Sequence, residues 1–99
     1  MELGTITAQE VKERLKKGEE LSLIDVREDE EVAEGMIEEA VHIKMMDVPS
    51  RLSEIDADKE HIIVCRSGKR SENVAYFLLD HGYTVKNMTG GMLAYNEAE

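Results

Sequence analysis

The fold of this chain is decided by the stretch His61-Ile62-Ile63-Val64-Cys65-Arg66-Ser67-Gly68-Lys69-Arg70-Ser71. Three β-branched apolar residues lead into Cys65, the one cysteine in the sequence, which is typical of a buried strand. A short loop of small and cationic residues follows, and an apolar pattern with helical spacing then runs from Ser71 to His81. The stretch therefore predicts a strand, a tight turn and a helix N-terminus, with a thiol where the strand ends.

These surroundings favour the thiolate form of Cys65. A helix N-terminus offers unpaired N–H groups and about half a positive charge, and Arg66, Lys69 and Arg70 add three cationic groups nearby. The pKa of a free cysteine is about 8.5, and such surroundings lower it. Successive backbone N–H groups in a loop of this kind also bind anions. We therefore expect a nucleophilic cysteine whose substrate or intermediate is anionic.

Composition limits the classes to which the protein can belong. The 99 residues are 41% hydrophobic and 34% charged, which predicts a single globular domain over residues 1–99. A net charge of −10 argues against nucleic acid and anionic membranes as partners. No apolar run approaches the roughly 20 residues of a membrane span, and the N-terminus lacks a secretory signal, so a cytoplasmic protein is expected. The sequence does not indicate the oligomeric state, and a monomer is the default. A lone cysteine excludes an internal disulfide, and no metal site is expected without a Cys/His cluster.

Strand and helix patterns alternate along the rest of the chain. Besides the strand at 61–64, apolar runs predict strands at residues 3–6, 21–26, 40–43 and 83–88. Helices are predicted at residues 8–17, 29–34, 48–55, 71–81 and 92–99, with a loop at 44–47. Thr7 and Glu10 have the spacing of a capping box before the first helix. The alternation predicts an α/β fold whose mostly parallel sheet is covered by helices on both faces, with a site beyond the carboxyl ends of the strands.

Five segments of the chain together carry a family resemblance. They are Ile6-Thr7-Ala8-Gln9-Glu10-Val11, Leu23-Ile24-Asp25-Val26-Arg27-Glu28, Glu34-Gly35-Met36-Ile37, Ile63-Val64-Cys65-Arg66-Ser67-Gly68-Lys69-Arg70-Ser71 and Thr89-Gly90-Gly91-Met92. In this order and spacing they resemble the rhodanese-like domain family. The resemblance implies a five-stranded parallel sheet flanked by helices. It also implies the chemistry of the sulfurtransferase members, which carry a sulfane sulfur as a persulfide on the loop cysteine.

The implied function is a thiosulfate sulfurtransferase with Cys65 as its catalytic nucleophile. Sulfur would pass from thiosulfate or a persulfide donor to cyanide, a cellular thiol or a protein, through a covalent intermediate and without a cofactor. We expect the substrate to be bound by the loop residues Arg66, Ser67, Gly68, Lys69, Arg70 and Ser71. Gly68 is the expected position of positive φ or of a close approach in this loop.

Two interpretations stay open for Asp25 and Arg27, which end a neighbouring strand. They brace the loop, or they form a structural ion pair. Cys65 is also expected to be exposed, because sulfur must be handed on from an accessible loop.

Two other functions compete with sulfurtransferase activity. Phosphatases and arsenate reductases of this fold use Cys-x5-Arg, a loop one residue longer that encloses a tetrahedral anion. Here Arg70 follows Cys65 with four residues between them, which favours a cradle for one sulfur atom. A regulatory or sulfur-carrier module, whose partner is another protein, is the alternative outside the enzymes.

Overall fold

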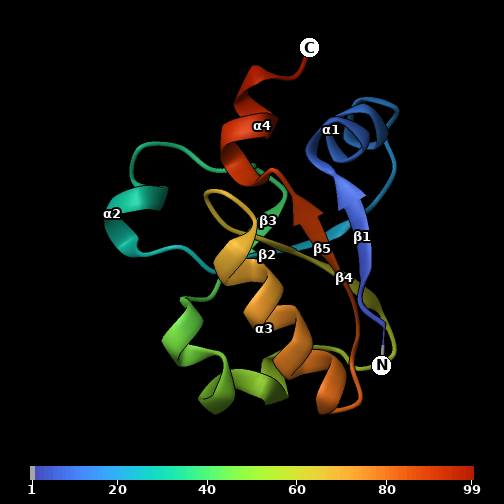
Figure 1. Ribbon diagram of the computed structural model, residues 1–99, viewed down its shortest axis with the longest axis vertical. Coiled ribbons are helices and arrows are strands. Elements are labelled where there is room, and N and C mark those ends of the chain that lie inside the picture. Colours follow the sequence, from blue (N-terminus) through green and yellow to red (C-terminus); the bar gives the residue numbers. More distant parts are fainter. Residues whose placement is uncertain (1) are drawn as a thin grey trace.

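One parallel sheet lies at the centre of the computed structural model, which describes residues 2–99 (Figure 1). The elements are β1 (Gly4–Thr7), α1 (Ala8–Lys16), β2 (Ser22–Asp25), α2 (Asp29–Val32), β3 (Ala40–His42), the 3-10 helices η1 (Met45–Asp47) and η2 (Pro49–Glu54), β4 (Glu60–Val64), α3 (Lys69–Asp80), β5 (Thr84–Thr89) and α4 (Gly91–Glu97). The strand order is β1-β5-β4-β2-β3, and every neighbouring pair is parallel. The predicted five-strand α/β architecture is therefore confirmed.

Strand β4 is the middle strand of the sheet and ends next to β2. Ile62, Ile63 and Val64 are all at most 2% exposed, because helices cover both faces of the sheet at this point. Val64 is in register with Asp25, and beyond that pair the Val26 N–H donates to the Val64 carbonyl at 2.9 Å. Cys65 thus follows the central strand at the carboxyl edge of the sheet, as the sequence predicts.

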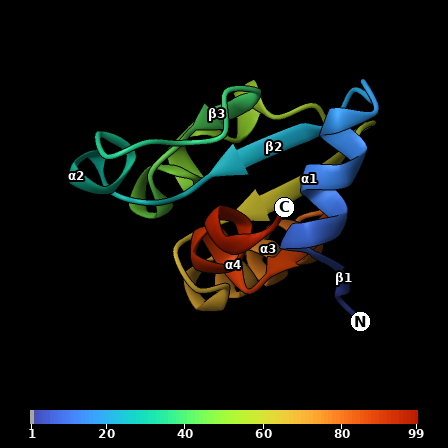
Figure 2. The same cartoon turned by 90° about the horizontal axis from the view of Figure 1, so that it is seen from above.

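Two hydrophobic clusters divide the molecule into layers. On one face, Val74, Ala75 and Leu78 of α3 pack with Ile24 and Ile63 of the sheet, together with residues around η1 and η2. On the other face, residues of α1 and α4 pack over β1, β4 and β5. Figures 1 and 2 show α4 beside α1, although these are the last and the first helices of the chain. Helices therefore cover both faces, as predicted.

The helix ends show how local sequence sets the boundaries. The Glu10 N–H donates to the Thr7 hydroxyl at 3.0 Å, and the Glu10 carboxylate accepts from the Thr7 N–H, so the predicted capping box is present. Helix α3 begins at Lys69, two residues before the predicted start. Gly68, with φ +101°, takes the N-cap position, which confirms its predicted positive φ and shortens the loop after Cys65.

The connection between β3 and β4 differs from its prediction. Residues 44–47 were expected to form a loop, but Met45–Asp47 is a 3-10 turn. The helix expected at 48–55 is also a 3-10 segment, and it is kinked at Arg51, whose φ is −117°. Short connectors favour such tighter turns, because they satisfy backbone groups without a full α-helical nucleus. No helix within residues 2–99 is long and apolar enough to cross a membrane.

Candidate active site

Cys65 lies at the end of β4 with its side chain in the cluster beneath α3. The residue is 0% exposed, so the prediction of an exposed cysteine is wrong. The chain turns back immediately after Cys65, and the Gly68 N–H donates to the sulfur at 3.1 Å. The turn that supplies hydrogen bonds to the sulfur is therefore also the turn that covers it.

The hydrogen bonds around the sulfur favour its charged form. Burial acts to raise the pKa of the Cys65 thiol, because it disfavours the thiolate. The Ser71 side chain, 3.2 Å from the sulfur, and the backbone N–H groups of the loop act in the opposite direction. Their combined effect is larger, and the pKa of Cys65 lies below its usual value. The low pKa expected from the sequence thus arises here from hydrogen bonds.

Asn87, a buried polar residue of β5, forms hydrogen bonds with both Ser71 and Gly68. The Ser71 hydroxyl donates to Asn87 Oδ1 at 2.6 Å, and Asn87 Nδ2 donates to the Gly68 carbonyl at 3.1 Å. Ser71 and Asn87 are 0% and 3% exposed. Asn87 was not among the predicted site residues. The sequence feature that could have indicated Asn87 is its place two residues after Val85 in a strand. Residues at this spacing lie on the same face, and Val85 is a core residue.

The start of α4 braces the loop from the other side. The Met92 N–H donates to the Cys65 carbonyl at 2.9 Å, and the Leu93 N–H donates to the Arg66 carbonyl at 3.0 Å. Gly91 makes this approach possible, because a Cβ at its position would overlap the Arg66 carbonyl and lie 2.6 Å from the Ser67 nitrogen. The segment 89–92, one of the five that carry the family resemblance, is therefore part of the site.

Arg70 is paired with a carboxylate of α2. Its two terminal nitrogens lie 2.6 and 2.7 Å from the two oxygens of Glu31. The hydrogen bond from Arg70 is the main cause that lowers the pKa of Glu31 to about 2. Glu31 lies within an acidic run, and nothing in the sequence distinguishes it from its neighbours. Contact of Arg70 with a sulfur donor stays a prediction.

Asp25 and Arg27 form a buried ion pair, with 2.8 Å between Nη2 and Oδ2. Arg27 also donates to the carbonyls of Gly35 at 2.9 Å and Glu31 at 3.4 Å. The pair thus fixes the segment around α2 to the end of β2. This geometry fits the interpretation as a structural ion pair. Through Glu31 the same segment reaches Arg70, so it also supports the loop indirectly.

The remaining loop residues face outward. Arg66, Ser67 and Lys69 are exposed, and Lys69 is 3.6 Å from Glu72 on the next turn of α3. Arg66 lines a pocket of about 280 Å³ between the segment around α2 and the start of α4. Leu93 and Asn96 are also in its lining. This pocket therefore lies beside the loop that follows Cys65.

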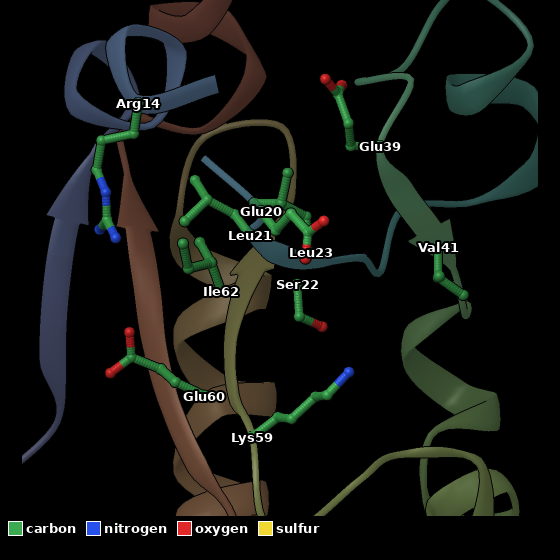
Figure 3. A pocket seen from close by; sticks show the side chains of 10 residues that line it. All are labelled: Arg14, Glu20, Leu21, Ser22, Leu23, Glu39, Val41, Lys59, Glu60 and Ile62. Atoms are coloured by element: carbon green, nitrogen blue, oxygen red, sulfur yellow. The ribbon is translucent and has the colours of Figure 1, made fainter. Parts of the chain in front are cut away.

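A larger pocket of about 600 Å³ lies at the amino ends of β2 and β4 (Figure 3). Its apolar lining comes from Leu21, Leu23 and Ile62, and Figure 3 shows charged side chains such as Arg14 and Glu60 around them. Cys65 follows the opposite end of β4. The pocket is therefore separate from the site built around the thiol.

A family model described as a rhodanese-like domain matches residues 7–98. The chain belongs to the rhodanese-like family.

Relatives of this rhodanese-like domain extend over nearly the whole chain. It is 52% identical to YtwF of Bacillus subtilis, a proposed sulfurtransferase, over 96% of this chain and 92% of that protein. It is 38% identical to a sulfurtransferase of Allochromatium vinosum, with coverage of 94% and 88%. The crystal structure of a rhodanese-like domain protein from Staphylococcus aureus superposes with a TM-score of 0.89 and 35% identity, over 94% and 91% of the two chains. The rhodanese-like domain described here is thus a member of a sulfurtransferase family.

Proposed function

We propose that this protein is a sulfurtransferase that carries sulfur as a persulfide on Cys65. The observation that carries the proposal is the convergence of the Gly68 N–H and the Ser71 hydroxyl on one buried sulfur, 3.1 and 3.2 Å away. Such groups stabilise a thiolate before reaction. They also offer hydrogen bonds to the charge of a persulfide after it.

The proposed cycle has two displacements. The Cys65 thiolate attacks the outer sulfur of thiosulfate, and the S–S bond of thiosulfate breaks with its electron pair leaving on sulfite. The enzyme then holds a cysteine persulfide. A nucleophile such as cyanide or a thiol attacks the outer sulfur, and the electron pair of the enzyme's S–S bond returns to Cys65 as thiolate. No external oxidant or reductant is needed, and the kinetics are ping-pong.

The loop residues have different parts in this proposal. The turn from Ser67 to Ser71 holds the reacting sulfur, with backbone N–H donors at Ser67, Gly68 and Ser71. Arg66 and Lys69 are the exposed cations that attract an anionic donor, and Arg66 lies in the pocket beside the loop. Arg70 reaches the donor only by exchanging its partner Glu31, so its first role is to position the loop.

The test is incubation of the protein with thiosulfate, followed by intact-mass measurement and then addition of cyanide. We expect an adduct of one sulfur atom on the wild type, its loss on cyanide addition, and formation of thiocyanate. Cys65→Ser is the matched control and should give neither adduct nor product.

Two other results would separate the competing functions. Absence of the adduct together with turnover of an aryl phosphate would refute the proposal in favour of a phosphatase. An adduct that forms but resists cyanide would instead indicate a sulfur carrier whose acceptor is a protein.

A further inference from the structure

The Ser71 hydroxyl lies between an acceptor that takes its proton, Asn87 Oδ1, and the Cys65 sulfur, which donates to it as a thiol and can accept from it as a thiolate. On one side is Asn87 Oδ1, 2.6 Å away, and on the other is the sulfur of Cys65, 3.2 Å away. A serine hydroxyl has a single proton to donate. Ser71 and Asn87 are buried, so water does not readily replace whichever hydrogen bond is given up.

The amide of Asn87 has one orientation in this network. The Gly68 carbonyl only accepts, so the NH₂ group of Asn87 must face it, 3.1 Å away. The amide oxygen is then directed at Ser71. In the neutral state the thiol donates to Ser71 and Ser71 donates to Asn87, so each group in the chain is satisfied.

Ionisation of Cys65 disturbs this chain. The thiolate has no proton to donate, and it is stabilised when the Ser71 proton turns toward it. That turn leaves the oxygen of Asn87 without its donor, which carries the free-energy penalty of a buried unsatisfied acceptor. Asn87 therefore competes with the thiolate for one proton.

We propose that Asn87 is a positioning residue that sets the direction of the Ser71 hydroxyl and, through it, the balance between thiol and thiolate at Cys65. The inference deepens the proposed persulfide cycle and rests on it for its biological meaning. A less stabilised thiolate is a stronger nucleophile toward the donor, because nucleophilicity falls with thiol pKa. The same thiolate is a poorer leaving group when the persulfide is discharged. Asn87 would thus balance the two steps.

Other charged groups stand on the elements packed around the thiol, and they must stay constant in a test. They are Asp25, Arg27, Glu31, Arg66, Lys69, Arg70 and Glu72. Replacement of Asn87 by a neutral residue changes none of these charges. Asn87→Leu removes both polar atoms while keeping a similar side-chain shape, and Asn73→Leu on the exposed face of α3 is the matched control.

The measurement is the rate of Cys65 alkylation by iodoacetamide as a function of pH. We expect Asn87→Leu to lower the thiol pKa by about half a unit to one unit, the worth of one hydrogen bond. The plateau rate at high pH should fall about twofold, since the nucleophile is weaker. In the Ser71→Ala background, Asn87→Leu should leave the pKa unchanged.

If Asn87 has only a structural role, the pKa of Cys65 should shift in the opposite direction in Asn87→Leu. If Asn87 only held the loop in place, its loss would loosen the hydrogen bonds to sulfur, and the pKa would rise toward that of free cysteine. A rise, or an equal shift in the Ser71→Ala background, would overturn the inference.

The wild type provides a second measurement that does not depend on the variant folding. The side-chain amide resonances of Asn87 in a ¹⁵N spectrum should titrate with the same midpoint as the alkylation of Cys65, and those of Asn73 should not. An Asn87 amide that is silent through the thiol titration would also overturn the inference. Alkylation requires no sulfur donor, so failure of the persulfide test and failure of this inference are distinguishable.

Discussion

The ion pair between Glu31 and Arg70 predicts a pH-dependent part of the stability. The pKa of Glu31 falls from 4.5 to about 2 in the folded protein, mainly through its hydrogen bonds with Arg70. A fall of that size corresponds to at most about 3.4 kcal/mol of unfolding free energy at neutral pH. The two side chains are 32% and 26% exposed, so water screens the pair, and we expect about 1–2 kcal/mol.

The sign of the pH dependence follows from the lowered pKa. Above pH 4.5 the carboxylate is ionised in the folded and the unfolded chain, and the pair contributes fully. As the pH falls from 4.5 toward 2, the unfolded chain takes up a proton that the folded chain does not, and the contribution is lost. Glu31→Gln, which keeps an oxygen to accept the Glu28 N–H, should therefore cost about 1–2 kcal/mol at pH 7 and much less near about pH 3.

Urea unfolding at the two pH values measures this effect. Glu30→Gln is the matched control, because it removes the same charge from an exposed position of the same short helix. A variant of Glu31 that is no less stable than the control at pH 7 would refute the reasoning. So would a difference between the two variants that stays the same at low pH.

Three further predictions concern the supports of the site. Gly91→Ala should displace the loop, abolish persulfide formation and cost at least about 2 kcal/mol, whereas Gly82→Ala, which has the same positive φ sign but open space around its Cβ, should cost about 1 kcal/mol and load normally. Lys12 donates to the carbonyls of Tyr95 and Ala98 at the end of α4, so Lys12→Met should lower stability by about 1 kcal/mol in thermal unfolding, with exposed Lys16→Met as control. Thr7→Ala should cost about 1 kcal/mol in urea unfolding, because it removes the N-cap of α1; an unchanged midpoint would contradict that role.

Much of the fold followed from patterns that are local in the sequence. The β-branched run 62–64 predicted the central strand, because a strand buried on both faces must be continuously apolar. Thr7 and Glu10 predicted a helix start, and the turn at Gly68 followed from its place between a strand and a helix. The short helix predicted at 48–55 is present as a 3-10 segment, a type that periodicity does not separate from a short α-helix.

The site was predicted less completely, because its supporting contacts join distant parts of the chain. Glu31 and Arg70 are 39 residues apart, and Ser71 and Asn87 are 16 apart. No local pattern indicates which of several acidic residues meets Arg70. The exposure of Cys65 was predicted wrongly for a similar reason. The transfer of sulfur to an acceptor suggested an accessible thiol. The hydrogen bonds that lower the thiol pKa, however, come from a turn that closes over the sulfur.

The bracing of the loop by α4 has a consequence for biosynthesis. The carbonyls of Cys65 and Arg66 are held by N–H groups of residues 92 and 93, and β1 pairs with β5, so early and late segments of the sequence lie side by side. During translation, the thiol is made well before the residues that complete its surroundings. A nascent chain that stops before Gly91 therefore lacks the N–H groups that hold the turn after Cys65, and activity should begin only after residues 91–93 have been added.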